Sequence, residues 1–398
     1  MPEPESNAVS NFRAYLRIPT AQPKPDYGQA TKFILNQANE IGLQPKVVEP
    51  VPGKPFIILT WLGRKPTLPS VMLYSHMDVV PVIEEKWFYG PFSAHKDANG
   101  DIYGCGAQDM KCTGIQYLEA IRQLKSKGVS RFRRTLHVVF GSEEEVGGKD
   151  GMDHFVLHPG FLELNVGFVL DEGTTSDDDV FRIFYAERCI WWMKVHFSGT
   201  MGHGSKLLDD TAAEKFQYVL AKFMEFREAQ RNRLLNDTSL TLGDVTSINL
   251  TKVEGGTQVN VVPSTITAYF DVRIPPTVDT EELLQLFKKW FKEAGSGIKC
   301  EFIMRDDPDP VTDVSDASAW WRAISHTLDN MGFRYKAEIA PGGSDSRFIR
   351  RAGIEALGFS AIKNTPILLH NHNEKLNEAM FLTGLRIYES LIPALANA

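Results

Sequence analysis

Three apolar, β-branched segments of this sequence each end in a cluster of histidine or acidic residues, and this repeated pattern constrains the fold most. The clusters are His76-Met77-Asp78, Ser142-Glu143-Glu144-Glu145 and Asp171-Glu172. Helix-like segments separate the apolar runs, so the runs are expected to form strands of an α/β sheet with parallel pairing. Such sheets bind ligands at the carboxyl ends of their strands. The pattern therefore predicts a polar site at one edge of the sheet.

The first part of the chain alternates between helical and strand-like periodicity. Apolar residues at near-helical spacing predict helices at about 27–41 and from Asp109 to near Gly128. Short apolar runs predict strands at 56–61, 71–75, 135–141 and 166–170. Helix and strand resume after about residue 307. This order favours a mixed, largely parallel sheet with flanking helices.

Between residues 187 and 306 the order of elements changes to βαββαβ. Thr211-Ala212-Ala213-Glu214 is a capping box that begins a helix, and residues 266–274 alternate between apolar and polar side chains. This order is typical of a small α+β unit with helices on one face of an antiparallel sheet. We therefore expect a catalytic domain in two pieces, 1–186 and 307–398, interrupted by an insert at 187–306.

Composition excludes several classes of partner. The formal net charge of −7 gives no reason to expect nucleic acid, and no apolar run approaches the roughly 20 residues needed to span a bilayer. The four cysteines are widely spaced without a C-x-x-C pair, which favours reduced thiols in the cytoplasm. The acidic start, Met1–Glu5, is unlike a signal peptide.

His76 and Asp78 lie two apart at a strand end, so their side chains should point to the same side. A metal-binding histidine usually donates its second ring N–H to a carboxylate. Each cluster also has a simpler interpretation. Asp109 precedes a helix and could be its N-cap, and the acidic run 143–145 could be a solvated surface.

Taken together, the clusters favour a metal centre. Two histidines and three carboxylates, with one spare acid, suit two zinc ions that share a bridging carboxylate. The four positive charges of two Zn²⁺ balance three carboxylates and a hydroxide, which limits the free-energy cost of burying the ions. Adjacent Glu144 and Glu145 can point in different directions, so one can bind metal while the other acts as a general base.

These residues resemble the M20 family of co-catalytic zinc peptidases and amidohydrolases. The resemblance covers most of the chain, and its most specific pieces are Ser75–Val80, Gly106–Cys112, Glu144–Gly148, and Gly255-Gly256 with Asn260-Val261. It implies a zinc exopeptidase-like catalytic domain. It also implies that the insert is a ferredoxin-like lid through which two subunits form a homodimer.

The resemblance implies the metal ligands residue by residue. His76 and Glu172 would bind one zinc, and Glu145 and His370 the other. Asp109 would bridge the two ions, with a cis peptide bond to the next residue. Two choices depend on the family pattern. The spacing His-x-x-x-Glu selects His370 over His372, and Glu172 is chosen over Asp171 because many members of the family use the second acid of this pair.

The remaining roles also follow from the resemblance. Asp78 would orient His76, and Glu144 would be the general base. His203 would come from the lid of the partner subunit and stabilise the oxyanion, and Arg347 is a candidate for binding the substrate carboxylate. Further substrate-binding candidates are Asn260, Arg273 and Gly343.

The implied activity is hydrolysis of N-acyl-L-amino acids to a carboxylate and a free L-amino acid. Two zinc ions per subunit would activate a water molecule, whose proton Glu144 would take and later deliver to the leaving amine. The alternatives are a dipeptidase of the same family and, from another class, a catalytically silent zinc-binding scaffold. Loss of Glu144 would be the signature of the silent protein, and this sequence retains it.

Overall fold

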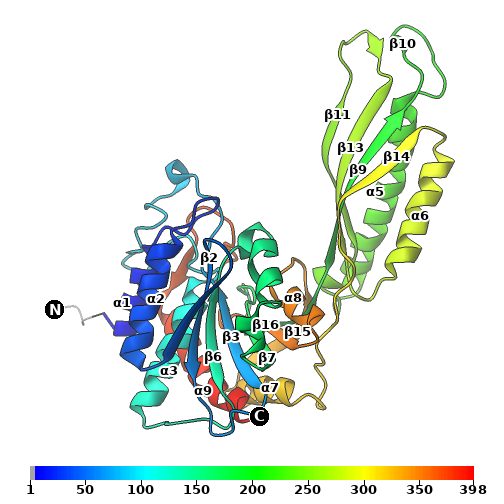
Figure 1. Ribbon diagram of the computed structural model, residues 1–398. Helices are drawn as coiled ribbons and strands as arrows, with labels where there is room; N and C mark the ends of the chain where they lie inside the picture. Colours follow the sequence, from blue (N-terminus) through cyan, green and yellow to red (C-terminus); the bar gives the residue numbers. More distant parts are fainter. Residues whose placement is uncertain (1–4) are drawn as a thin grey trace. The chain divides into compact units, whose positions relative to one another are not determined.

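The computed structural model describes residues 5–398 and divides them into two compact units (Figure 1). Unit 1 contains the described chain up to Tyr185, together with Val311–Glu338 and Ser344–Ala398. Unit 2 contains Ala186–Pro310 and Ile339–Gly343. The sequence-based division used junctions at 186/187 and 306/307 and did not anticipate that the short segment 339–343 belongs with the insert. Residues 1–4, part of the acidic start considered above, lie outside the described residues.

Unit 1 is built on an eight-stranded mixed sheet in the order β1-β2-β6-β3-β7-β16-β8-β15. The four central strands β6, β3, β7 and β16 pair in parallel, and the pairs β1–β2, β2–β6 and β16–β8 are antiparallel. The predicted mixed, largely parallel sheet is thus confirmed. The strands are β1 (Gln44–Val51), β2 (Lys54–Trp61), β3 (Ser70–His76), β6 (Leu136–Gly141), β7 (Val166–Asp171), β8 (Val180–Glu187), β15 (Arg334–Ala340) and β16 (Glu355–Phe359).

Helices cover both faces of this sheet, which explains why its central strands read as continuous apolar runs. Every residue of β3 and of β6 is buried. On one face of the sheet, the hydrophobic core includes Phe12, Ile121 and Tyr388, which come from three different helices. On the other face, a second core includes Phe155 and Phe348. The helices are α1 (Asn7–Leu16), α2 (Tyr27–Ile41), α3 (Lys111–Ser126), α4 (Pro159–Leu162), α7 (Ala319–Asn330), α8 (Ser346–Arg351) and α9 (Glu378–Asn397).

A close backbone approach near the end of β2 requires glycine at position 63. A Cβ atom there would lie 2.3 Å from the carbonyl carbon of Arg134, and neither backbone can yield without shifting the sheet. We expect Gly63→Ala to lower the free energy of unfolding by about 1–3 kcal/mol, measured as a lower Tm. The matched control is Gly90→Ala, whose Cβ would meet nothing closer than 3.9 Å. Equal melting of the two variants would contradict the prediction.

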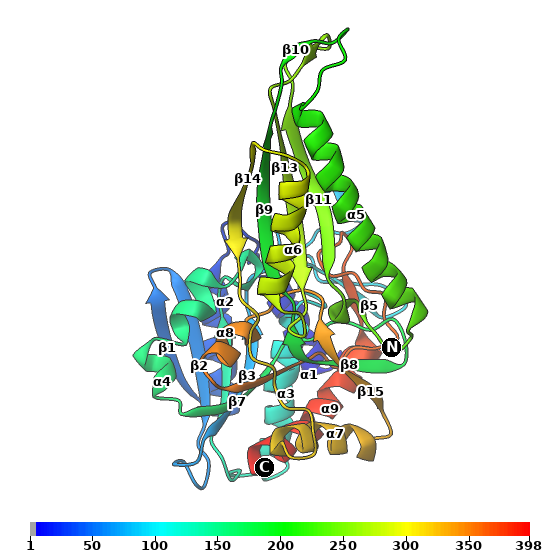
Figure 2. The same ribbon diagram turned by 90° about the vertical axis from the view of Figure 1, so that its right-hand side faces the viewer.

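Unit 2 has the predicted βαββαβ order. Its four antiparallel strands lie in the order β11-β13-β9-β14, a ferredoxin-like arrangement, and two helices lie on one face of the sheet (Figure 2). The capping box is present, with Thr211 and Glu214 each accepting from the other's backbone N–H. The elements are β9 (Cys189–Ser198), α5 (Ala212–Asn236), β11 (Ser247–Gly255), β13 (Thr265–Ile274), α6 (Thr280–Glu293) and β14 (Ile298–Arg305).

Two small sheets complete the described chain. In unit 2, β10 (Gly202–His203) pairs with β12 (Val261–Val262). In unit 1, β4 (His95–Lys96), β5 (Asp101–Tyr103) and β17 (Lys375–Asn377) form a three-stranded sheet. Among the described helices, none is both long and apolar enough to cross a bilayer.

Candidate metal centre

The central parallel strands bring three of the predicted clusters to one edge of the sheet. His76 is the last residue of β3 and pairs with Gly141, the last residue of β6, so the segment 142–145 begins beside it. β7 lies on the other side of β3 and ends at Asp171, directly before Glu172. Because carboxyl ends of parallel strands meet at one edge, side chains that are 96 positions apart, such as His76 and Glu172, become neighbours.

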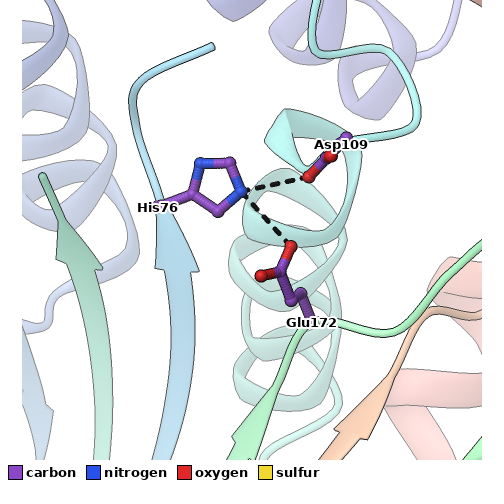
Figure 3. Close-up of side chains that lie close together, drawn as sticks. All are labelled: His76, Asp109 and Glu172. Atoms are coloured by element: carbon purple, nitrogen blue, oxygen red, sulfur yellow. Dashed lines mark hydrogen bonds and ion pairs between the residues drawn. The ribbon is translucent and has the colours of Figure 1, made fainter. Parts of the chain in front are cut away.

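His76, Asp109 and Glu172 form the first group of side chains (Figure 3). The His76 Nε2 atom lies 3.1 Å from Asp109 Oδ1 and 3.4 Å from Glu172 Oε2. His76 is fully buried. Asp109 precedes α3 but is not its N-cap, because that position is Met110 and carries no side-chain cap. The simpler interpretation of Asp109 is therefore excluded.

Asp109, Glu145 and His370 form the second group. The His370 Nε2 atom lies 3.2 Å from Asp109 Oδ2 and 3.0 Å from Glu145 Oε2. Asp109 thus presents one oxygen to each histidine. In both groups the possible ligand atoms lie within 4.8 Å of one another. The two groups together contain the five residues that the resemblance implied as ligands. His372 belongs to neither group.

The pKa shifts of the two groups reflect several carboxylates that lie close together with few positive charges beside them. Hydrogen bonds to Asp109 and Glu145 raise the pKa of His370 to about 10. Burial alone would lower the pKa of His76, but its contacts with Asp109 and Glu172 raise it well above the usual value. Burial and the nearby Asp109 charge raise the pKa values of Glu145 and Glu172. The carboxylates are held together against their mutual repulsion.

These residues fit a pair of zinc ions. Imidazole nitrogen and carboxylate oxygen are zinc ligands, and each group supplies one nitrogen and two carboxylates around a common Asp109. Positive ions between them would replace the repulsion among the carboxylates by attraction. The Asp109–Met110 peptide bond is cis, as the resemblance implied.

Asp78 contacts the ring of His76 through its backbone carbonyl rather than through its carboxylate. The ring of His76 donates from Nδ1 to the backbone carbonyl of Asp78, 2.9 Å away, whereas the nearest carboxylate oxygen is at 3.8 Å. The carboxylate instead accepts from the backbone N–H groups of Glu144 and Glu145 at 3.3 and 3.2 Å and from Gln22. Asp78 therefore holds the acidic loop as well as the histidine.

The acidic run 143–145 is not a solvated surface, because Glu143 is buried and Glu144 and Glu145 are partly buried. Glu143 adopts a left-handed conformation with φ of 71°, and its carboxylate contacts Tyr27 at 2.9 Å and Lys54 at 2.7 Å. This anchoring lets Glu144 and Glu145 enter the site in one short 3₁₀ turn. Burial and the charge of Glu172 raise the pKa of Glu144 well above its usual value.

Among the predicted substrate-binding residues, Arg347 contacts the loop that follows Glu145 in unit 1. Its guanidinium donates to the carbonyl of Gly147 at 2.7 Å, two residues after Glu145. Gly343 is the last residue of the short segment 339–343, which belongs to unit 2. Neither position is a metal ligand.

The other predicted substrate residues lie within unit 2. His203 is exposed and pairs with Val261, and the backbone N–H of Gly204 donates to the carbonyl of Asn260 at 2.7 Å. Arg273 forms a two-pronged ion pair with Asp271 at 2.7 and 2.9 Å. It lines a cavity of about 680 Å³ whose wall also carries three other arginines, namely Arg188, Arg227 and Arg231.

Sequence reasoning missed one acidic residue beside the site. In the sequence, Glu374 was considered only as the last residue of the His-x-x-x-Glu spacing. In the structure, its carboxylate accepts a hydrogen bond from the backbone N–H of Asp109. Its position in a segment of polar residues gave no sign of burial, but Glu374 is only 2% exposed.

Comparison with known proteins identifies the family of the chain. Peptidase family M20/M25/M40 matches residues 72–394, so the chain belongs to this family of peptidases and related hydrolases. Within it, the chain is 48% identical over 396 residues to aminoacylase-1 of Homo sapiens, covering 100% of this chain and 97% of the human protein. It is 40% identical over 406 residues to aminoacylase-1 of Dictyostelium discoideum, covering 99% of this chain and 98% of that protein.

A solved structure supports the fold independently. The M20 family metallo-carboxypeptidase Sso-CP2 from Sulfolobus solfataricus is similar with a TM-score of 0.74 at 17% identity, covering 98% of this chain and 100% of that chain. At this low identity the similarity shows the shared fold, and the similarity to aminoacylase-1 carries the functional argument.

Proposed function

We propose that this protein is a dizinc amidohydrolase that hydrolyses N-acyl-L-amino acids to a carboxylate and a free L-amino acid. The observation that carries the proposal is the pair of His/carboxylate groups sharing Asp109, in a chain 48% identical to aminoacylase-1 over its whole length. His76 and Glu172 would hold one zinc, Glu145 and His370 the other, and Asp109 both. When bound, the ions supply Lewis-acid activation of water and of the amide carbonyl.

Glu144 is the proposed general base. It adjoins the ligand Glu145 on one 3₁₀ turn, its backbone is fixed by Asp78, and burial keeps the pKa of its carboxyl group high. A carboxylate in such a place can take a proton from the attacking water and return it to the leaving amine. Arg347, beside the same loop, would bind the substrate carboxylate, with Gly343, Asn260 and Arg273 as further contacts.

The four cysteines support a reducing compartment. All four are free thiols, and burial raises the pKa values of the Cys105, Cys112, Cys189 and Cys300 groups, which keeps them unreactive. We propose a cytoplasmic location on this ground.

We further propose a homodimer formed through unit 2, in which the partner subunit's His203 stabilises the oxyanion. Loss of one such donor typically costs about 10²–10³ in rate, so His203→Ala homodimers should be nearly inactive. Glu144→Gln homodimers should be inactive as well. A mixed dimer of the two variants has one complete site, because the His203→Ala chain keeps Glu144 and receives an intact histidine.

Mixing the two inactive variants tests this arrangement. Co-refolded protein should recover a sizeable fraction of wild-type activity, measured against each variant refolded alone. Differently tagged chains, captured through one tag and detected through the other, report whether subunits have exchanged. With exchange demonstrated, absence of recovery would place His203 outside the partner's site.

The substrate class is tested by a hydrolysis screen that varies the acyl group and the amino acid separately. We expect acetyl- and longer acyl-L-amino acids to be cleaved with a higher kcat/KM than dipeptides that carry the same carboxy-terminal residue. The reverse order would favour the family's dipeptidases. Zinc binding without hydrolysis of any member of the panel would favour a silent scaffold.

A further inference from the structure

The carboxylate of Glu374 binds the backbone segment that carries Asp109. Its Oε2 atom accepts from the N–H of Gly106 at 2.8 Å, and its Oε1 atom accepts from the N–H groups of Gln108 and Asp109 at 2.5 and 3.1 Å. These three converging backbone donors supply hydrogen bonds to both oxygens of the side chain. A glutamate buried at 2% exposure is thus fully occupied in holding one loop.

Gln108 makes the reciprocal connection, from the Asp109 loop to the chain on either side of His370. Its side-chain nitrogen donates to the carbonyl oxygens of Pro366 and Lys375 at 3.0 and 2.8 Å. Its side-chain oxygen accepts from the N–H of Leu368 at 3.0 Å and from the hydroxyl of Thr175 at 3.2 Å, so three of its four contacts are to the segment around His370. The two side chains therefore fasten the loop before Asp109 and the loop around His370 to each other.

Lys111 anchors the other end of the segment that carries Asp109. Its ammonium group is fully buried and donates to the carbonyl oxygens of Ile18 at 2.7 Å and Tyr15 at 3.5 Å. These carbonyls lie at and just beyond the carboxyl end of α1, where a positive charge is stabilised by the helix dipole. The segment between Gly106 and Lys111 is consequently held at one end by the side chain of Glu374 and at the other by the side chain of Lys111.

We propose that Glu374 is a positioning residue for the shared ligand: it fixes the Asp109 backbone so that each carboxylate oxygen faces one histidine. Gln108 has the complementary role and fixes the segment that presents His370. This inference rests on the proposed dinuclear centre, since it concerns the placement of a ligand common to both ions. Glu374 itself lies in neither ligand group.

The physical reason is that one carboxylate must satisfy two ions at once. Asp109 Oδ1 lies 3.1 Å from His76 and Oδ2 lies 3.2 Å from His370, so a small rotation of its backbone would lengthen one distance while shortening the other. Partners outside the ligand set that orient a ligand typically contribute 10–100-fold in metal affinity. Loss of the Glu374 contacts should therefore weaken both ions, whereas loss of the Gln108 side chain should weaken chiefly the ion at His370.

The test measures metal binding to metal-free protein, independently of catalysis. Zinc affinity is determined by competition with a chromophoric chelator, and the absorption spectrum of the cobalt-substituted protein reports ligand geometry. We expect Glu374→Gln to weaken both sites by about 10–100-fold and to change the cobalt spectrum. In this variant an amide N–H₂ would face backbone N–H donors, which disrupts the contacts while keeping the size of the side chain.

The matched control is Glu119→Gln, a buried glutamate of α3 at 3% exposure that contacts Asn11 and Arg122 instead. We expect it to alter Tm without changing either zinc affinity or the cobalt spectrum. Gln108→Ala is the second variant and decides the matter if Glu374→Gln does not fold. It should weaken one site by about 10-fold or more and leave the other within a factor of about three.

Wild-type zinc and cobalt affinities for both sites in Glu374→Gln, or in Gln108→Ala when only that variant folds, would overturn the inference. Equal effects of Glu374→Gln and Glu119→Gln on metal binding would overturn it as well, because they would indicate a general effect of a buried charge. Failure of the proposed function is distinguishable from these results. In that case the wild-type protein itself would bind fewer than two ions, or would bind two without hydrolysing N-acyl amino acids.

Discussion

Replacing Glu144 by glutamine should lower kcat by roughly 10²–10⁴, the range typical for loss of a general base. The amide has nearly the same size and can still accept a hydrogen bond, but it cannot take a proton. Because Glu144 lies in neither ligand group, the variant should keep its metal ions and its KM should change little. Steady-state kinetics together with metal analysis of the purified variant measure both quantities.

Glu145→Gln is the matched comparison, since it alters the neighbouring carboxylate on the same turn. Glu145 lies 3.0 Å from His370, so its change should weaken one metal site, and added zinc should recover part of the activity. Loss of metal from the Glu144 variant but not from the Glu145 variant would reverse the assignment of base and ligand.

Removal of metal should abolish activity altogether. Without the ions, no Lewis acid remains to polarise the attacking water and the amide carbonyl, and Asp109, Glu145 and Glu172 face one another with only two histidines between them. Dialysis against a chelator should give inactive, folded protein, and about two equivalents of zinc per chain should restore hydrolysis. Activity is followed with an acetyl amino acid, and circular dichroism checks that the metal-free chain stays folded. Full activity in metal-free protein would be incompatible with the proposal.

The order of the strands accounts for most of the placement of the candidate site residues. Once 71–75, 135–141 and 166–170 are parallel strands with helices between them, His76, Glu145 and Glu172 must meet at one edge. The helix expected at 27–41 is α2 (Tyr27–Ile41), bounded by Asp26 and a left-handed Gly42. The family resemblance that supplied the ligand assignments is confirmed by the comparisons.

Other features depend on contacts between distant segments and could not be derived from local patterns. The ring of His76 donates to the backbone carbonyl of Asp78 rather than to its carboxylate. The two acceptors belong to the same residue, so the position of Asp78 in the sequence does not show which of them the ring contacts. The joining of 339–343 to the insert and the burial of Glu374 likewise depend on tertiary packing. Neither has a periodic signature.

The roles of His203, Asn260 and Arg273 remain proposals for a related reason. Each lies within unit 2, and the side chains of His203 and Arg273 contact residues two positions away in the sequence, Ser205 and Asp271. A residue that acts on a substrate held elsewhere shows its role only in a complex. The mixed-dimer experiment supplies that information for His203.

The central claim is that five side chains form one dinuclear centre around Asp109. The most direct measurement is anomalous diffraction from crystals of the zinc-loaded protein, recorded on both sides of the zinc absorption edge. The account predicts two peaks, one between His76, Asp109 and Glu172 and the other between Asp109, Glu145 and His370. A single peak, or peaks at side chains other than these five, would contradict it.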